Sequence, residues 1–354
     1  MSRTLEDIRL LDFRCFHSLE FVPGDARTFI VGQNARGKTS LLEAICVLLR
    51  LQSPRTTAMA ETVRSGCAAF AIDGHARGAH LACSWQEGAR KIALDSKAQT
   101  RSEDYLSVAK IAWFANTDLE LVRGGGSVRR RYLDFLAMQS VPGYRAALRS
   151  FDRALRSRNA LLKDNRPRRE IAAFDEPLAA AGEVLLEARA LLCDALAPLT
   201  AQAGREISSA SDEIEIRFRP GANGSLRVEL ERSRPEEERL RQTVVGPHRD
   251  DILVRLNAME ASTFASEGQQ RTISLALKLA QARHLEAVQG APPLFLLDDV
   301  FGELDASRRN RLLACLPRES QVFITTTFLD WAETNSTDAI FEFSESHTIS
   351  RVRA

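Results

Sequence analysis

A lysine and a threonine, Lys38 and Thr39, end a glycine-rich stretch whose residues are suited to binding phosphate. The stretch follows the pattern G-x-x-x-x-G-K-T, in which backbone N–H groups and a helix N-terminus surround phosphate oxygens. We expect Lys38 to reach the β- and γ-phosphates of a nucleotide, and the Thr39 hydroxyl to ligate Mg²⁺. The residues predicted to bind the nucleotide here are Gly32, Gln33, Asn34, Ala35, Arg36, Gly37, Lys38, Thr39 and Ser40.

The segments on either side of this loop fit that chemistry. Residues 28–31 predict a short buried strand, and residues 40–45 predict the start of an amphipathic helix. A strand, a glycine-rich turn and a helix, in this order, are the context that a phosphate loop requires. A chance glycine turn in an α/β protein is the alternative, and the complete pattern disfavours it.

Two carboxylates, Asp298 and Asp299, follow a continuous apolar run at residues 294–297. Such a run is typical of a parallel strand buried on both faces, which would place Asp298 beside the phosphate loop. We expect Asp298 to hold Mg²⁺ together with Thr39, and Asp299 to orient or deprotonate the attacking water. A strand followed by an acidic turn would also explain the pattern. Residues 302–305, which end in Asp305, favour the nucleotide interpretation because they suit a D-loop at the nucleotide.

A third motif, Ser266-Glu267-Gly268-Gln269, follows Lys38 by 228 residues. Ser266, Gly268 and Gln269 at a helix start offer a hydroxyl and a positive dipole end to a γ-phosphate. We expect this element to lie too far from the loop of its own subunit, so that ATP is enclosed between two copies of the chain. Binding of ATP would then join the copies, and hydrolysis would separate them. Alone, the motif is also explained by an ordinary helix N-cap.

Together these motifs resemble those of the RecF family of bacterial recombinational-repair proteins, within the ABC/SMC-type ATPases. Further matching stretches are 119–122, 129–134, 158–163, 246–251, 265–279, 296–305 and 323–327. The resemblance implies an α/β, ABC-type ATPase head, split in sequence, with an inserted α-helical lobe. It also implies weak ATPase activity with ATP and Mg²⁺, an ATP-dependent homodimer, and binding of single- and double-stranded DNA at gaps or junctions. The implied role is recombinase loading with RecR and RecO partners, in replication restart and the SOS response.

Three positions depart from the family pattern. Ala35 stands where glycine is usual, so a left-handed backbone there would be strained by ~1 kcal/mol or more. Gly302 replaces the expected D-loop serine, and residues 113–118 lack the family's proline-containing version, which leaves the Q-loop residue unassigned. These departures bear on the rate of hydrolysis.

The pattern of elements predicts three segments: head residues 1–112, a mainly helical lobe at 113–243, and head residues 244–354. Leu178, Leu185 and Leu192 recur every seven residues and indicate a helix-packing stripe. Pro198 interrupts this register, and we expect residues 208–211 to end the helical segment.

The lobe also concentrates positive charge, with nine basic and two acidic residues between positions 144 and 169. Such a stripe can follow DNA phosphates and make binding steeply salt-dependent. The predicted DNA-binding residues are Arg149, Arg153, Arg156, Arg166, Arg168 and Arg169. The alternative is a solvated face that pairs with residues 236–238 or with Glu183 and Glu187. The residues leave both open, and the resemblance favours DNA.

A cluster of His248, Asp250 and Asp251 could be interpreted as metal ligands. A single histidine beside carboxylates is more often a hydrogen-bonded structural residue, so we assign it no metal.

Composition limits the remaining possibilities. The net charge is +1, so DNA affinity has to come from local patches. The six cysteines lack metal-type spacing, and no apolar run approaches ~20 residues, so we expect a cytoplasmic protein without a membrane anchor. A transporter ATPase would carry a switch histidine where Thr325-Thr326-Thr327 stands, and an SMC or Rad50 protein would need hundreds more heptad residues. A nucleotide-gated scaffold with negligible hydrolysis stays open.

Overall fold

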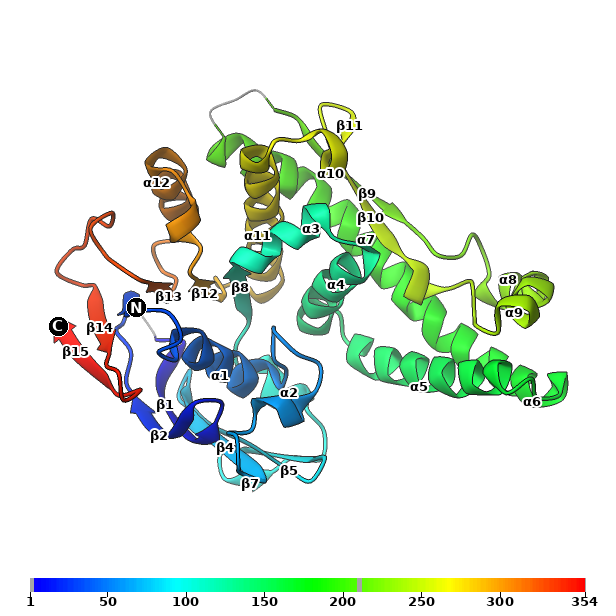
Figure 1. The fold of residues 1–354 in the computed structure, drawn as a ribbon, viewed down its shortest axis with the longest axis horizontal. Helices are drawn as coiled ribbons and strands as arrows, with labels where there is room; N and C mark the ends of the chain where they lie inside the picture. The colour runs from blue at the N-terminus through cyan, green and yellow to red at the C-terminus, as the bar shows by residue number, and fades with distance from the viewer. Residues whose placement is uncertain (1–2, 209–211, 354) are drawn as a thin grey trace. The chain divides into compact units, whose positions relative to one another are not determined.

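The computed structural model describes residues 3–208 and 212–353, and the chain forms two compact units. Residues 1–117 and 285–354 make up the first, here called the head unit, and residues 118–284 make up the second, the lobe unit. The two ends of the chain therefore build one unit. Figure 1 shows this by colour, because blue and red strands lie together in the head unit.

The central sheet of the head unit is mainly parallel and has the strand order β15-β14-β3-β13-β12-β8. Only β15 runs antiparallel to its neighbour, β14. The strands are β3 (Arg27–Val31), β8 (Ile111–Ala115), β12 (Leu294–Asp298), β13 (Val322–Thr326), β14 (Ala339–Phe343) and β15 (Ile349–Arg353). The predicted apolar run forms β12, whose first four residues are buried, as expected of a strand covered on both faces.

A second sheet of the head unit is antiparallel, in the order β2-β1-β4-β5-β6-β7. Along β4, buried residues alternate with half-buried ones, as expected where one face of a sheet packs on a core. The strands are β1 (Leu5–Phe13), β2 (Phe16–Phe21), β4 (Ala69–Ala76), β5 (Ala79–Gln86), β6 (Ala89–Leu94) and β7 (Lys97–Ala98).

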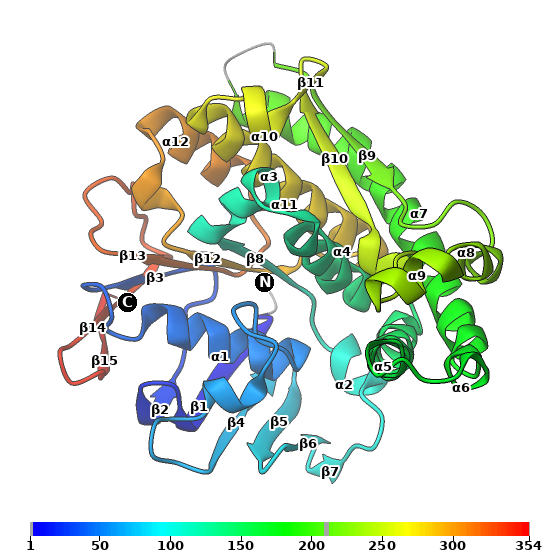
Figure 2. The ribbon, with the colours of Figure 1, turned by 45° about the vertical axis from the view of Figure 1, so that its right-hand side comes forward.

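Helix α1 (Lys38–Arg50) lies between these two sheets, as Figure 2 shows. Residues 41–50 are all buried, including the carboxylate residue Glu43. The prediction of an amphipathic helix is therefore wrong, because a helix covered by a sheet on each side has no solvent face. The other head elements are η1 (Met59–Thr62), α2 (Glu103–Ser107), η4 (Phe301–Glu303) and α12 (Ala306–Cys315).

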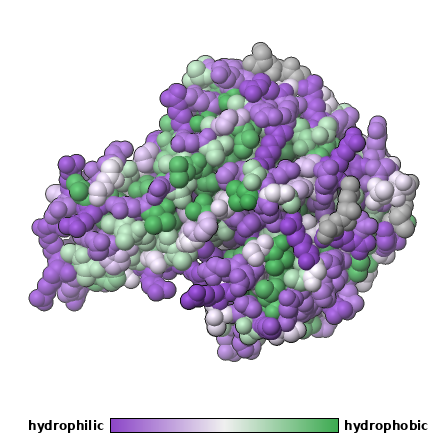
Figure 3. Space-filling model, turned by 180° about the vertical axis from the view of Figure 1, so that it is seen from behind, coloured by the Kyte–Doolittle hydropathy of each residue, from purple (hydrophilic) through white to green (hydrophobic). Residues whose placement is uncertain are grey.

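The lobe unit is mainly helical and is built around α7 (Asp175–Ile207), which packs against α5 (Tyr144–Lys163). The predicted stripe of Leu178, Leu185 and Leu192 is buried in this packing. Pro198 lies inside α7 and does not end it, and the helix stops at Ile207. Residues 209–211, where the segment was expected to end, lie outside the described residues. The view from behind in Figure 3 shows hydrophobic side chains on the surface of the lobe.

The remaining lobe helices are short, apart from α4 with 15 residues. The elements are α3 (Glu120–Arg123), α4 (Gly126–Ser140), α6 (Arg168–Ala172), α8 (Leu226–Arg232), α9 (Arg234–Leu240), η3 (Pro247–Arg249) and α10 (Ala261–Phe264). Two elements cross between the units, namely η2 (Asn116–Leu119) and α11 (Glu267–Gln289).

The units have different boundaries from the predicted segments, since residues 244–284 lie in the lobe unit. The physical reason is a small antiparallel sheet in which β10 (Asp251–Leu256) pairs with β9 (Ile214–Arg219) and β11 (Met259–Glu260). In addition, the Tyr132 hydroxyl donates to the Leu277 carbonyl over 2.7 Å. These pairings join segments that are distant in sequence, and a local pattern does not reveal them.

Among the helices of the described residues, none is both long enough and apolar enough to cross a membrane.

Candidate nucleotide site

The predicted phosphate loop connects β3 to α1, as its sequence context required. Its first residue, Gly32, donates its N–H to the Thr326 carbonyl of β13 over 3.2 Å. Gly37 has φ 106° and immediately precedes the helix. A Cβ at Gly37 would lie 2.8 Å from the ring of Phe16 and 3.1 Å from the Cys15 sulfur. Glycine is therefore required there by both backbone conformation and space.

Ala35 has the left-handed backbone that the sequence led us to expect, with φ 64°. This conformation costs an alanine about 1 kcal/mol relative to glycine. The loop therefore keeps its shape at this position despite the side chain.

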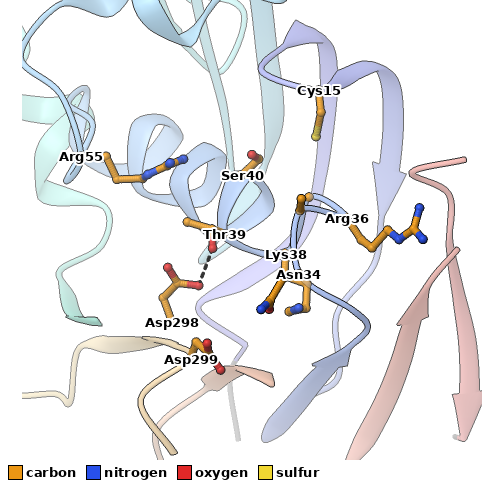
Figure 4. Close-up of a pocket in the computed structure, with 11 residues that line it drawn as sticks. Cys15, Asn34, Arg36, Lys38, Thr39, Ser40, Arg55, Asp298 and Asp299 are labelled. Atoms are coloured by element: carbon orange, nitrogen blue, oxygen red, sulfur yellow. Dashed lines mark hydrogen bonds between the residues drawn. The ribbon is translucent and has the colours of Figure 1, made fainter. Parts of the chain in front are cut away.

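The loop opens into a cavity of about 300 Å³. Residues 34–40 line it together with Asp298 and Asp299, which arrive from β12. Figure 4 shows Thr39, Lys38 and the two carboxylates converging on this space. The first backbone N–H groups of α1 belong to the same wall, and within the described chain no side chain caps them. A cavity with these groups can bind an anion.

The ammonium of Lys38 is buried in the loop, where it donates to the carbonyl oxygens of Gly32 and, over 2.9 Å, of Gln33. Burial lowers the pKa of Lys38, while the carboxylates of Asp299 and Asp298 act in the opposite direction. Lys38 therefore places a cation between the loop carbonyls and the two carboxylates. Gly32 and Gln33 contribute to the site through these backbone oxygens.

The Thr39 hydroxyl donates to Asp298 Oδ1 over 2.8 Å, which brings the two predicted metal ligands together. Burial raises the pKa of Asp298, and hydrogen bonds from Thr39 and Thr325 oppose this shift. A hydroxyl and a carboxylate are oxygen donors of the kind that Mg²⁺ prefers. The residues present therefore fit the ion that the sequence predicts.

Asp299 follows directly, with φ 52°, and also lines the cavity. Burial raises the pKa of its carboxyl group, whereas the nearby Lys38 lowers it. Its backbone N–H donates to the Thr325 hydroxyl over 2.9 Å. The residue is therefore held at the edge of the cavity by backbone contacts, with its carboxylate available.

Arg55 and Cys15 also line the cavity, and the sequence analysis identified neither of them. The guanidinium of Arg55 donates to Glu43 Oε2 over 3.0 Å, and Arg14 donates to the same carboxylate over 2.6 Å. Glu43 is fully buried on α1, so it fixes both arginines. The signal in the sequence was the single charged residue Glu43 in the otherwise apolar run at 41–49, which indicates a buried ion pair.

The predicted D-loop residue Asp305 does not line this cavity. Its side chain caps α12 by accepting the Arg308 N–H over 2.9 Å, and this hydrogen bond lowers the pKa of Asp305. At Gly302, a Cβ would lie 3.5 Å from Asp299 Oδ1, an ordinary contact distance. A serine would therefore fit at position 302.

The third motif lies in the lobe unit and begins α11. Ser266 Oγ accepts the Gln269 N–H over 3.3 Å, and Gln269 Oε1 accepts the Ser266 N–H over 2.9 Å. This reciprocal pair is a capping box. The N-cap alternative is thus present as a structural role, and the Ser266 hydroxyl still has its own proton to donate. Contact with a phosphate on a second subunit stays a prediction for Ser266, Gly268 and Gln269.

Comparison with known proteins decides the family. A family model described as "RecF/RecN/SMC N terminal domain" matches residues 4–349. The chain belongs to the RecF family. The "DNA replication and repair protein RecF" of Anaeromyxobacter sp. (strain Fw109-5) is 39% identical over 340 residues, covering 91% of this chain and 92% of the relative. The protein of the same name from Gloeothece citriformis (strain PCC 7424) is 34% identical, covering 93% and 94%.

Solved structures agree with this RecF assignment. The structure of "the recombination mediator protein RecF-ATP in RecFOR pathway" superimposes with a TM-score of 0.88 at 27% identity, covering 99% of this chain and 98% of the other. The Smc head domain of Pyrococcus furiosus, at 14% identity and a TM-score of 0.56, shares the fold. The RecF-type chain is thus an α/β ABC/SMC-type ATPase head, split in sequence, with an inserted lobe.

The lobe of this RecF-family chain presents three outward arginines on α5, here called the outer arginines: Arg149, Arg153 and Arg156. All three are exposed, and among the described residues no carboxylate lies within ion-pair distance of any of them. Two of the acids proposed as their partners have other partners, since Glu237 pairs with Arg158 over 2.7 Å and Glu236 lies 3.9 Å from Arg239. Arg166, in contrast, pairs with Glu170 over 3.0 Å, and Arg168 and Arg169 are exposed at α6.

The cluster of His248, Asp250 and Asp251 has structural partners. His248 Nε2 lies 2.9 Å from the Thr243 carbonyl, and burial lowers the pKa of His248 to about 4. Asp250 accepts from Arg189 over 2.7 Å, and Asp251 accepts from Arg129 over 2.6 Å. These contacts give the two carboxylates a structural role within the lobe.

Proposed function

We propose that this RecF-type chain binds ATP with Mg²⁺ in the loop cavity and hydrolyses it slowly, as a switch that controls its association with a second copy and with DNA. One observation carries the proposal: the cation of Lys38, the hydroxyl of Thr39 and the carboxylates of Asp298 and Asp299 line one cavity at a helix N-terminus. ATP is named in the solved relative that superimposes on almost the whole chain. Phosphate, metal and water each have a matching group in this arrangement.

Each residue has a distinct part in this reaction. Lys38 would leave its carbonyl partners for the β- and γ-phosphate oxygens, where its charge opposes theirs. Thr39 and Asp298 would hold Mg²⁺, which would neutralise charge on the same oxygens. Asp299 would accept a hydrogen bond from the attacking water and orient it towards the γ-phosphate. Because α1 is buried along residues 41–50, its N-terminus is held in place before the nucleotide arrives, and Lys38 is the group that has to move.

The signature motif would complete the site from a second copy of the chain. Ser266 keeps its N-cap while its hydroxyl proton is free to be donated, so a γ-phosphate can be recognised without unwinding α11. Asp305 would act at the same interface through its cap of α12. This arrangement makes association depend on ATP, because the nucleotide supplies the group that both copies contact.

DNA binding would use the outer arginines of α5, assisted by Arg166, Arg168 and Arg169. The outer arginines are exposed, and among the described residues no carboxylate lies within ion-pair distance of them, so their charge is available to phosphates. The DNA that this surface would recognise is gapped DNA or a junction between single and double strands. Single-stranded segments would be bound as well. The RecFOR pathway named for the solved relatives supports RecR- and RecO-type partners in recombinase loading during repair and replication restart.

The first experiment tests nucleotide binding. Lys38→Ala removes the cation of the loop, so ATP binding in equilibrium dialysis should be lost while the circular dichroism spectrum stays that of the wild type. Lys97→Ala is the matched control, because Lys97 is an exposed lysine on β7. Wild-type ATP affinity in Lys38→Ala would refute the phosphate-loop assignment.

The second experiment distinguishes a hydrolytic switch from a nucleotide-gated scaffold with negligible hydrolysis. Asp299→Asn keeps the shape of the side chain and removes its charge. We expect phosphate release to fall and ATP-bound dimers to accumulate in light scattering. A wild-type chain that dimerises with ATP but releases no phosphate would instead establish the scaffold.

A further inference from the structure

Thr325 lies between the two strands that carry the nucleotide motifs. It belongs to β13, where it is fully buried, and it pairs with Asp298 of β12 on one side and Ile30 of β3 on the other. Parallel pairing places it at the carboxyl edge of the sheet, where the phosphate loop and the carboxylates also lie. Its neighbour Thr326 accepts the Gly32 N–H at the start of the loop.

The Thr325 hydroxyl connects the two carboxylate residues directly. It donates to Asp298 Oδ1 over 2.9 Å and accepts the backbone N–H of Asp299 over 2.9 Å. The Leu297 carbonyl also lies 3.5 Å from this hydroxyl, but a hydroxyl has one proton, and the shorter contact with the Asp298 carboxylate uses it. Asp298 Oδ1 thereby receives two hydroxyl donors, one from Thr325 and one from Thr39.

These contacts restrict both carboxylates. The two donors on Oδ1 fix the rotation of the Asp298 side chain about its bonds, which determines the direction of its second oxygen. The accepted N–H holds Asp299 in its left-handed conformation of φ 52°, which is unfavourable for a residue with a side chain. Without that hydrogen bond, the backbone of Asp299 would relax and its carboxylate would leave its position at the cavity.

We propose that Thr325 is a positioning residue for ATP hydrolysis, whose single hydroxyl aligns the metal-binding carboxylate of Asp298 with the water-orienting carboxylate of Asp299. This inference rests on the proposed function, and it assigns a role to a residue that does not line the loop cavity. The consequence is that metal binding and water positioning depend on one atom of β13. A change in the position of β13 would alter both together.

The test compares Thr325→Val, which removes the hydroxyl at nearly constant volume, with Thr325→Ser, which keeps it. Thr28→Val is the matched control, because Thr28 is equally buried in the same sheet and its hydroxyl accepts a backbone N–H, from Gly24 over 3.0 Å. Turnover of ATP, the Mg²⁺ concentration for half-maximal turnover, and nucleotide affinity at saturating Mg²⁺ are measured for each full-length variant.

Loss of an outer hydrogen-bond partner of a metal ligand typically costs about 10–100-fold in metal affinity or activity. We expect Thr325→Val to lose turnover by a factor in this range and to need correspondingly more Mg²⁺, with nucleotide affinity at saturating Mg²⁺ nearly unchanged. Thr325→Ser should restore both quantities to within a few-fold of wild type. Thr28→Val should keep wild-type turnover and Mg²⁺ dependence, because its hydroxyl does not contact a carboxylate.

Wild-type turnover and Mg²⁺ dependence in Thr325→Val would overturn the inference, as would equal losses in Thr325→Val and Thr28→Val. Should Thr325→Val not fold, Thr325→Cys offers a weaker donor of similar size and is expected to be impaired in the same two quantities. Failure of the proposed function is recognised separately, because the wild-type chain would then bind no ATP. If the wild type binds ATP without hydrolysing it, the Mg²⁺ dependence of nucleotide binding still decides the role of Thr325.

Discussion

Arg158 provides the sharpest test of how the lobe is held together, because it lies on the same helix as the outer arginines and is only 1% exposed. Its guanidinium contacts Asp175 over 2.9 Å, Glu237 over 2.7 Å and the Thr243 hydroxyl over 2.8 Å. Glu237 is also 1% exposed, so neither partner is screened by water. The substitution Arg158→Met keeps the apolar stem and leaves Glu237 as a buried carboxylate without its cation.

The expected loss follows from that burial. Removing one member of a buried ion pair costs about 3–5 kcal/mol. With a urea dependence of about 2 kcal/mol per molar for a unit of this size, a loss of 3 kcal/mol lowers the unfolding midpoint by roughly 1.5 M. Relative to the whole stability of a domain, typically about 5–15 kcal/mol, this is a large change.

The assay can separate the two units. All three tryptophans, at positions 85, 113 and 331, belong to the head unit, whereas the long helices α5 and α7 belong to the lobe. Far-ultraviolet circular dichroism should therefore report the loss of the lobe in Arg158→Met. Arg156→Met is the control, since loss of an exposed arginine with no carboxylate in ion-pair distance should change stability by less than about 0.5 kcal/mol. Equal midpoints for the two variants would refute the argument from burial.

Three further changes test other parts of the molecule. Reversing the outer arginines to glutamate should weaken duplex DNA binding and lower the slope of log affinity against log salt by roughly one unit per lost phosphate contact, measured by fluorescence anisotropy; an unchanged slope would make them a solvated face. Ser266→Arg should still bind ATP but fail to dimerise in light scattering. Mixing it with Lys38→Ala should return partial ATPase activity, because in the mixed dimer one of the two sites between the copies carries both substitutions and the other carries neither. Burial lowers the pKa of His248 to about 4, so its neutral form stabilises the fold fully above pH 6.5, and this contribution, about 3 kcal/mol, is lost as the pH falls from 6.5 towards 4. His248→Gln should flatten that decline in urea titrations.

The local part of the site could be predicted from the sequence because local chemistry determines it. The strand before the loop, the helix from Lys38 and the buried strand ending at Asp298 are each specified by residues that are adjacent in the chain. Even the left-handed backbone of Ala35 followed from the position of that residue in the motif. Such features depend on φ, on hydrophobic pattern and on glycine placement, all of which can be read from short segments.

The remaining features arise from pairings between distant segments. The solvent-free environment of α1 depends on a second sheet, and the place of residues 244–284 in the lobe unit depends on the pairing of β9 with β10. The contacts of Thr325 and Arg55 are likewise long-range, so neither residue stands out in a motif. A single sequence specifies these pairings only through the energy of the whole fold.

The split head has a consequence for how the chain is made. Strand β3 lies between β14 and β13, and roughly 290 residues must be synthesised after β3 before β13 exists to pair with it. At about 5–20 residues per second, the phosphate-loop strand waits for something like 15–60 s with both edges unpaired. The lobe is complete before that wait ends, so it can fold on the ribosome first. The nascent head segment is therefore the part of this protein that most needs protection from aggregation during synthesis.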